Sequence, residues 1–253
     1  MKTISLLNLK GGVGKTTSAV NIAKGLANKG RKVLLIDTDM QANATSVFIS
    51  EDKTNSDDYK SFADMLIDKA ANPLSYMYPI NENLDIIGGD LSIASTELNL
   101  RQDFTRPTPE ILKKNLEKIK DKYDYCIIDC SPTLSLLTIN VILASDQVII
   151  PIKVGKFAVK GFEVTYNNIL DIKEGYNVDT NFKVLYTMVN RNNTDREVMD
   201  SLPVDKFDTT IRYQAKPVTD SEIKGLLLVD GKDSNVKQDY IDLIEEIDRE
   251  GKA

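Results

Sequence analysis

Eight consecutive residues, KGGVGKTT at positions 10–17, combine the residue types that bind nucleotide phosphates. Glycine carries no Cβ, so a loop with three glycines can turn tightly and aim its backbone N–H groups at phosphate oxygens. Lys15 can reach the β- and γ-phosphates, and the Thr16 hydroxyl can bind Mg²⁺, whose charge offsets phosphate oxygens that the backbone cannot neutralise. We therefore assign phosphate binding to Lys10, Gly11, Gly12, Val13, Gly14, Lys15, Thr16 and Thr17.

Three acidic residues directly follow apolar runs elsewhere in the chain. Asp37 and Asp39 come after the run at 32–36, and Asp129 comes after the run at 125–128. Buried parallel strands read as nearly continuous apolar runs, and ligands of such sheets bind outside the carboxyl ends of the strands. The glycine-rich loop also follows an apolar run, so we expect the loop and the three carboxylates at one edge of one sheet.

The strands and helices that must position these residues alternate along the sequence. Apolar runs predict strands at residues 4–9, 32–36, 84–87, 125–128, 147–152 and 182–189. Periodic apolar residues predict helices at 19–27, 91–100, 109–120, 134–143, 159–173, 196–202 and 236–249. The polar residues 50–60 predict a surface loop, and residues 206–212 an extended segment. We therefore predict an α/β fold with a doubly wound, mostly parallel sheet and helices on both faces, in a single domain over residues 1–253.

Composition narrows the function classes further. The chain has no histidine, which excludes histidine-based acid–base catalysis. Cys126 and Cys130 lie in one predicted strand, so their Cα atoms would be about 13 Å apart, too far for a disulfide. The net charge of −6 argues against a wholly basic nucleic-acid binder. No apolar run approaches the roughly 18 residues of a membrane span, so we expect a reduced, soluble protein of the cytoplasm.

The glycine-rich loop departs from the general P-loop pattern, because Leu9 stands where that pattern has a glycine. With a second lysine, Lys10, at its start, the loop resembles the deviant P-loop of the ParA/MinD family of ATPases. The stretches LLIDTDMQAN, NLDIIGGDLSIASTEL, YDYCIIDCSP and VDGKDSNVKQDY extend the similarity to ParA-type partition ATPases over nearly the whole chain. The resemblance implies a deviant-Walker P-loop fold that hydrolyses ATP with Mg²⁺.

The resemblance also implies roles for single residues. Lys15 would contact the β/γ-phosphates, Thr16 and Asp129 would hold Mg²⁺, and Asp39 would orient the attacking water. Asp37 would support the metal and the loop, although it could equally cap the turn that follows it. Met40 and Ser131 stand where the family commonly has proline, which bears on the shape of the dimer and partner surfaces.

Lys10 matches the family's signature lysine, which reaches across a nucleotide-sandwich dimer to the partner's phosphates. Its charge would act there as an arginine finger acts on the transition state. Asn190 and Arg191 resemble the segment whose asparagine reads the adenine edge, because an amide offers both a donor and an acceptor. As a residue at a strand end, Asn190 could instead shape a turn.

The function that the resemblance implies is partition of a plasmid or chromosome. Such an ATPase forms a homodimer on ATP binding, coats nonspecific double-stranded DNA close to the nucleoid, and is released by a ParB-like centromere-binding protein. The best match to the family's DNA-binding arginine is Arg212 in TTIRYQAKP. The wider set of candidates for DNA phosphates is Arg191, Lys206, Arg212, Lys216 and Lys224, and a solvated surface is the alternative interpretation.

Two alternative functions remain open at the level of the sequence. A MinD-like membrane-associated positioning ATPase would need a basic amphipathic helix at the carboxyl end, whereas residues 240–250 carry five acidic residues and one arginine. The other alternative is a different deviant-Walker P-loop enzyme. An iron–sulfur relative of this kind needs two well-separated interface cysteines, and Cys126 and Cys130 do not fit that requirement.

Overall fold

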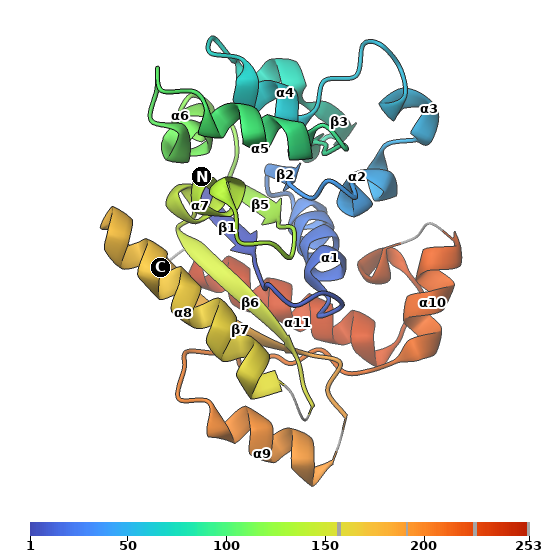
Figure 1. Ribbon diagram of the computed structural model, residues 1–253. Coiled ribbons are helices and arrows are strands. Elements are labelled where there is room, and N and C mark those ends of the chain that lie inside the picture. Colours follow the sequence, from blue (N-terminus) through green and yellow to red (C-terminus); the bar gives the residue numbers. More distant parts are fainter. Residues whose placement is uncertain (156–157, 191, 225–226, 252–253) are drawn as a thin grey trace.

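The computed structural model describes residues 1–155, 158–190, 192–224 and 227–251, and one seven-stranded sheet runs through this part of the chain (Figure 1). The strands are β1 (Lys2–Leu6), β2 (Val33–Asp37), β3 (Tyr78–Asn81), β4 (Leu84–Ile87), β5 (Tyr125–Asp129), β6 (Gln147–Lys153) and β7 (Asn181–Thr187). Their order across the sheet is β3-β4-β2-β5-β1-β6-β7, and only the β3–β4 pair is antiparallel. The predicted mostly parallel, doubly wound sheet is confirmed.

The register of the three central strands brings their carboxyl ends to one level. Asp129 at the end of β5 pairs with Asp37 at the end of β2 on one side and with Leu6 at the end of β1 on the other. All five residues of β2 and of β5 are buried, as their continuous apolar sequences predict. The two carboxylates and the start of the glycine-rich loop therefore lie at the same edge of the sheet.

Helices cover both faces of the sheet (Figure 1). They are α1 (Lys15–Asn28), α2 (Asn43–Phe48), α3 (Glu51–Thr54), α4 (Phe62–Ile67), α5 (Ile93–Arg101), α6 (Ile111–Glu117), α7 (Leu136–Ala144), α8 (Ala158–Tyr176), α9 (Asn193–Ser201), α10 (Ala215–Lys224) and α11 (Asn235–Glu250). Short 3₁₀ turns occur at Pro73–Tyr76, Thr108–Glu110 and Leu228–Asp230. Within the described ranges, no helix combines the length and the apolar character needed to span a bilayer.

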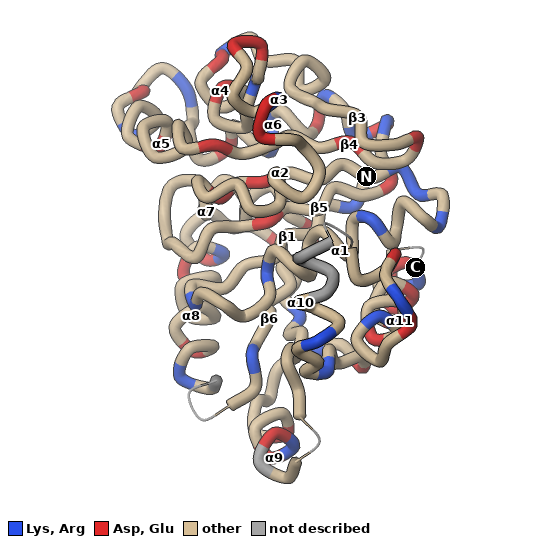
Figure 2. Tube along the Cα trace, turned by 90° about the vertical axis from the view of Figure 1, so that its right-hand side faces the viewer, with Lys and Arg blue, Asp and Glu red and all other residues tan. Residues whose placement is uncertain are grey.

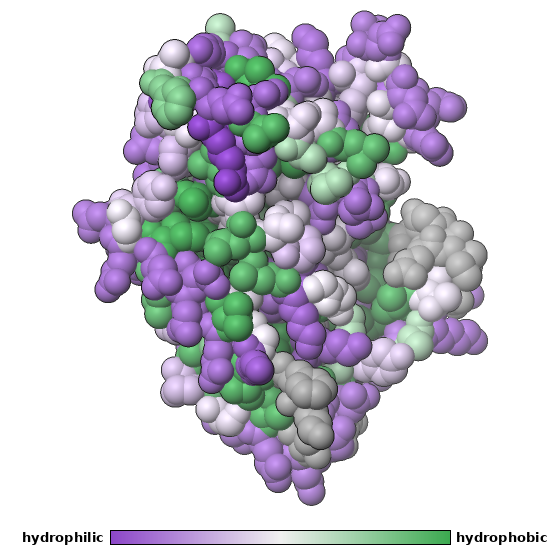
Figure 3. Space-filling model, viewed as in Figure 1, coloured by the Kyte–Doolittle hydropathy of each residue, from purple (hydrophilic) through white to green (hydrophobic). Residues whose placement is uncertain are grey.

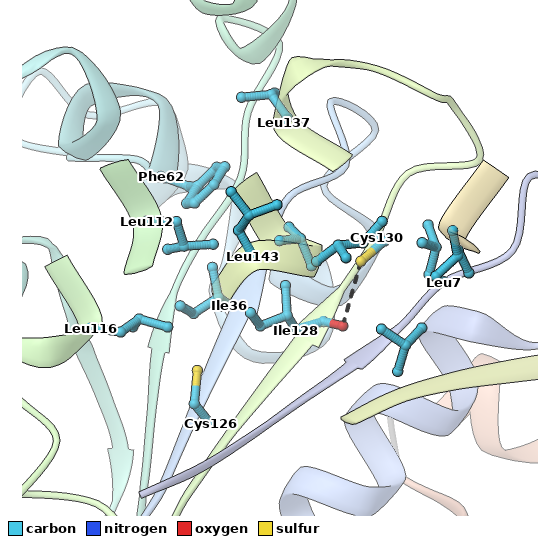
Figure 4. Packing of buried hydrophobic residues seen from close by; sticks show 14 of the residues in the cluster. Leu7, Ile36, Phe62, Leu112, Leu116, Cys126, Ile128, Cys130, Leu137 and Leu143 are labelled. Carbon is cyan, nitrogen blue, oxygen red and sulfur yellow. Dashed lines mark hydrogen bonds between the residues drawn. The ribbon is translucent and has the colours of Figure 1, made fainter. Parts of the chain in front are cut away.

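The apolar side chains of β2, β4, β5, β6 and β7 divide between two hydrophobic cores. Cys126 and Ile128 of β5 join the core under α4, α6, α7 and α8, whereas Tyr125 and Ile127 join the core under α1 and α11. Figure 4 shows the first core, in which both cysteines point into apolar surroundings. Both thiols are free, and their burial raises the pKa of each above its ordinary value. They are packing residues at these positions.

The structure differs from the sequence predictions mainly at element ends. The loop predicted over residues 50–60 is wrong at its start, because α3 forms there with Glu51 and Asp52 at its amino end, where acidic residues favour a helix. Helix α7 begins later than predicted because the Ser135 hydroxyl accepts hydrogen bonds from the first-turn N–H groups. The sequence analysis also missed α2, α4, α10 and the edge strand β3, all of which are ten residues or shorter.

The close approach of α1 and α11 depends on a glycine, and this yields a stability prediction. A Cβ built on Gly25 would lie 2.1 Å from Cδ1 of the buried Ile244. We expect Gly25→Ala to lower the free energy of unfolding by about 1–3 kcal/mol through overpacking, in spite of alanine's higher helix propensity. Gly175→Ala in α8, where nothing lies within 4 Å of the new Cβ, is the matched control and should be neutral or stabilising. Urea unfolding of both variants measures this, and an unchanged Gly25→Ala would contradict the packing argument.

Candidate active site

The glycine-rich loop joins β1 to α1 and leaves the amino end of α1 open. Gly12 and Gly14 adopt left-handed backbone conformations, with φ of 69° and 87°, which side chains with a Cβ strongly disfavour. Gly14 occupies the N-cap position, so no side chain accepts a hydrogen bond from the first-turn N–H groups of α1. A Cβ on Gly11 or Gly12 would meet nothing within 4 Å, so the loop faces open space. This is the geometry of an anion cradle at the positive end of a helix.

The two lysines of the loop occupy opposite environments. Lys15 is only 7% exposed, and its Nζ donates to the backbone oxygen of Lys10 at 3.2 Å. Burial lowers the pKa of Lys15, and the nearby Asp129 carboxylate, the Cys130 thiol and Asp39 act in the opposite direction. Lys10 is exposed at the start of the loop. Lys15 therefore lies inside the site, whereas Lys10 lies at its rim.

Asp129 is a fully buried carboxylate without a hydrogen-bond partner among the described residues. Burial raises its pKa well above the ordinary value, and the neighbouring Asp37 adds to this, while Thr16 and Lys15 oppose the shift. Within the part of the chain that the structure describes, no cluster of three or more histidine, cysteine or acidic residues could hold a metal by itself. A lone buried carboxylate beside a threonine hydroxyl fits Mg²⁺, which takes few protein ligands and keeps water and phosphate oxygens.

Asp37 is also fully buried, but both of its oxygens have partners. One accepts from the backbone N–H and the hydroxyl of Thr45, at 2.8 and 2.7 Å, and the other from the N–H of Asp39 at 3.1 Å. The Thr45 hydroxyl in turn accepts from the N–H of Gly89, which ties the ends of β2 and β4 to α2. These contacts are those of a cap for the turn, and the metal role of Asp37 stays a prediction.

Asp39 lies on the wall of a cavity of about 780 Å³ at this edge of the sheet. It is partly exposed, and its Oδ1 accepts from the N–H of Gln41 at 3.0 Å. The cavity is lined by residues of four segments: Gly11, Gly12, Gly14, Lys15, Thr16, Thr17; Asp39, Met40, Gln41, Asn43; Ile93, Ala94, Glu97, Arg101; and Ser131, Pro132, Thr133, Leu134, Ser135, Leu137. The structure thus brings Asp39 to the glycine-rich loop, as predicted.

The sequence analysis missed the contribution of α5 to this cavity. Glu97 pairs with Arg101 at 2.7 Å and also accepts from the N–H of Leu136, the first residue of α7. Glu97 therefore joins α5 to the helix that follows Asp129 and its loop. The pair lies four residues apart on a helix, a spacing that by itself signals only a surface ion pair.

A second cavity, of about 230 Å³, lies on the other side of the loop. Its lining is Gly14, Thr17, Thr187, Met188, Ile211, Arg212, Tyr213, Gln214, Ala215, Val218, Thr219, Leu228, Val236 and Tyr240. Asn190 is not among these residues; it is exposed, and its N–H donates to the Asp195 carboxylate at 2.7 Å. Arg191 lies outside the described residues. The sequence signal for this region was the extended segment at 206–212. The N–H of Ile211 donates to the backbone oxygen of Tyr186 in β7, and Arg212 forms a bridge with Val189, just beyond β7.

Arg212 is held by the protein itself. Its Nε and Nη2 donate to the Asp239 carboxylate of α11, its Nη2 also donates to the backbone oxygen of Asn235, and its own N–H donates to Asp239. Lys216 is exposed on α10, and the side chain of Lys224 lies outside the described residues. Figure 2 shows basic and acidic positions side by side along α11. Arg212 therefore lies against a helix of mixed charge and is paired with its Asp239.

The unpartnered Asp129 yields a prediction with a defined sign. The pKa of Asp129 is higher in the folded than in the unfolded protein, so ionisation of this carboxyl lowers the free energy of unfolding. This loss of stability is absent below the pKa of the unfolded state and grows as the pH rises above that value. Asp129→Asn should therefore raise the melting temperature of nucleotide-free protein at pH 7.5, by about 2–4 °C per kcal/mol gained. The difference from the parent should shrink as the pH falls to 5. Thermal unfolding at both pH values checks this, and a destabilised Asp129→Asn would mean that the carboxylate has a partner.

A family model described as an AAA domain matches residues 1–183. The sporulation initiation inhibitor protein Soj of Bacillus subtilis is 36% identical over 257 residues, which cover 99% of each chain. A putative plasmid partition protein of Borrelia burgdorferi, solved with bound AMPPNP, is 30% identical with a TM-score of 0.78, covering 98% of this chain and 97% of that one.

The same architecture occurs in a protein whose name describes a synthase and not a partition protein. Cobyrinic acid a,c-diamide synthase of Mycobacterium smegmatis, solved with an ATP analogue and magnesium, is 25% identical with a TM-score of 0.83, covering 100% of this chain and 96% of that one. The fold is thus shared more widely than any single activity. The full-length similarity to Soj carries the family assignment: the chain belongs to the Soj/ParA family of P-loop partition ATPases.

Proposed function

We propose that this protein hydrolyses ATP, forms an ATP-bound sandwich dimer, binds nonspecific double-stranded DNA in that state, and partitions a plasmid or chromosome with a ParB-like centromere-binding partner. It would act in the cytoplasm, on the nucleoid. The observation that best supports the proposal is the pairing of a buried Lys15 with an exposed Lys10 in one open glycine-rich loop. A phosphate site needs a lysine in the position of Lys15, and the exposed Lys10 is available to another molecule.

Different residues of the first cavity would bind different parts of Mg²⁺-ATP. The N–H groups of the loop and of the first turn of α1 would bind phosphate oxygens, and the Lys15 ammonium would neutralise the β- and γ-phosphates. Thr16 and Asp129 would hold Mg²⁺, which supplies positive charge next to the phosphates when bound. The nucleoside would enter the second cavity, since Gly14 and Thr17 line both cavities.

Hydrolysis would depend on positioning rather than on a strong base. The partly exposed carboxylate of Asp39 faces the first cavity and would orient the attacking water. Lys15 and the partner's Lys10 would stabilise the charge that develops on the transferred phosphoryl group. Because the chain has no histidine and relies on positioning, we expect slow turnover.

Exposed apolar side chains around the first cavity favour a second copy of this chain as the partner. Met40 and Leu134 line the cavity and are 39% and 50% exposed, and Leu91 and Leu98 lie exposed on or beside α5. Figure 3 shows apolar areas among hydrophilic ones on the face that carries α5, α7 and α8. A second copy over this rim would cover apolar side chains and bring Lys10 near the nucleotide of its partner.

The membrane-associated alternative has less support. The apolar residues of α11, Val236, Tyr240, Leu243, Ile244 and Ile247, are buried, and α11 packs on α1. An amphipathic helix that binds a lipid surface needs a free apolar face and a basic polar face. Here the apolar face belongs to the core, and the outward positions include acidic Asp242 and Glu245.

The experiment that tests the proposal uses Asp39→Ala. We expect this variant to bind ATP with the parent's affinity and to lose at least about 10²-fold in turnover, because the water is no longer oriented. With saturating Mg²⁺-ATP it should be a dimer by light scattering. Adding Lys10→Ala should abolish the dimer and leave nucleotide binding, whereas Lys15→Ala should weaken nucleotide binding itself. An Asp39→Ala protein that stays monomeric with ATP would contradict the sandwich dimer, and wild-type turnover would contradict the role of Asp39.

DNA binding has its own prediction, which uses the ion pair of Arg212. If Arg212 contacts phosphate, Arg212→Ala should weaken binding to all duplex sequences alike and lower the salt slope by about one. Asp239→Asn removes the competing carboxylate charge and should strengthen binding. Salt titrations with random duplex and Mg²⁺-ATP or Mg²⁺-ADP measure both. Equal affinity in the two nucleotide states, or no effect of either substitution, would count against this face.

A further inference from the structure

A buried hydrogen-bond cluster lies directly before the glycine-rich loop. Asn8, which precedes the loop, is 2% exposed, and Thr165, in α8, is 1% exposed. The Thr165 hydroxyl accepts from the N–H of Leu9 at 3.2 Å and donates to Oδ1 of Asn8 at 3.0 Å. Asn8 also donates through Nδ2 to the backbone oxygen of Pro151 in β6 at 2.7 Å. The cluster therefore fastens the end of the first strand segment to both α8 and β6.

The same cluster reaches Lys10. Oδ1 of Asn8 accepts from the N–H of Lys10 at 2.9 Å, and the backbone oxygen of Lys10 accepts from Nζ of Lys15. Both backbone polar groups of Lys10 are thus held by side chains. Lys15 is the first residue of α1 and takes its position from the helix, whereas Lys10 lies outside any helix or strand. The backbone of Lys10 is therefore positioned by its hydrogen bonds with Asn8 and Lys15.

Helix α8 also borders the side chain of Lys10. A Cβ built on Gly161 would lie 3.4 Å from Cδ of Lys10, so the lysine stem runs past this glycine. Gly161 and Thr165 are four residues apart and therefore lie on one face of α8. One face of this helix thus contacts the loop at two levels: the backbone through Thr165 and the lysine stem at Gly161.

We propose that Asn8 and Thr165 are positioning residues for Lys10, and that the face of α8 with Gly161 and Thr165 sets the direction of the Lys10 side chain. The proposal rests on the function proposed above for Lys10 in the dimer. Its physical basis is the burial of the cluster, since a buried N–H that loses its acceptor has no water to replace it. Loss of the Thr165 hydroxyl would leave the N–H of Leu9 without its acceptor and release the start of the loop.

The test compares Thr165→Val, which keeps the shape and removes the hydroxyl, with Thr165→Ser, which keeps the hydroxyl. In nucleotide-free protein, amide hydrogen exchange of the peptide containing Leu9 and Lys10 should be about tenfold faster in Thr165→Val than in Thr165→Ser. In the Asp39→Ala background, the ATP-induced dimer should weaken about tenfold with Val and change little with Ser, while the Kd for ATP stays within about threefold. A general folding defect would instead speed exchange throughout the chain, weaken the dimer and raise the Kd for ATP together.

A second pair of variants addresses the lysine stem without touching the cluster. Gly161→Leu should push the stem aside and weaken the dimer with no change in exchange at Leu9, whereas Gly161→Ala, whose Cβ fits at 3.4 Å, should behave as the parent.

Unchanged exchange in Thr165→Val overturns the anchoring role. Faster exchange with an unchanged dimer overturns the link to Lys10. Faster exchange in a protein whose Asp39→Ala parent never dimerises supports the anchor and refutes the proposed dimer instead.

Discussion

The parallel register of β2 and β5 puts two carboxylates, Asp37 and Asp129, beside each other in a fully buried position. Two adjacent buried charges are costly unless each is compensated. Asp37 is compensated by Thr45 and the N–H of Asp39, so it organises the turn that carries Asp39. Asp129 has no hydrogen-bond partner among the described residues, and the groups near it that favour its charge are Thr16 and Lys15. The site therefore contains a buried carboxylate whose negative charge a divalent cation could balance.

The two lysines of the loop differ in their exposure and in the contacts that hold them. Lys15 is fixed by the first turn of α1 and loses solvent, which places its charge where the chain's own ligand would bind. Lys10 keeps its solvent and depends on Asn8 for the place of its backbone. The difference arises because the helix begins at Lys15, so residues before it need contacts with other elements. Here those elements are α8 and β6, which are distant in sequence and adjacent in the fold.

The carboxyl-terminal third of the chain completes the site from the other side. Segment 206–213 lies along β7 through backbone hydrogen bonds, and Arg212 and Gln214 fasten it to the first turns of α11 through Asp239 and Val236. This gives the second cavity a wall that is tied to the helix packed on α1. The ion pair at this place joins the wall to α11 and restricts the Arg212 side chain.

The sequence by itself determined the sheet, the long helices and the meeting of the glycine-rich loop with the strand-end carboxylates at one edge, because apolar runs, glycine spacing and strand-end acids are local signals. It also indicated the family, through motifs that span nearly the whole chain. Only the tertiary structure decided that Asp37 is saturated and Asp129 is not, that Glu97 and Arg101 reach the cavity, and that Arg212 is paired with Asp239. Each of these depends on contacts between residues far apart in sequence or on solvent exclusion, and neither leaves a periodic pattern in the chain.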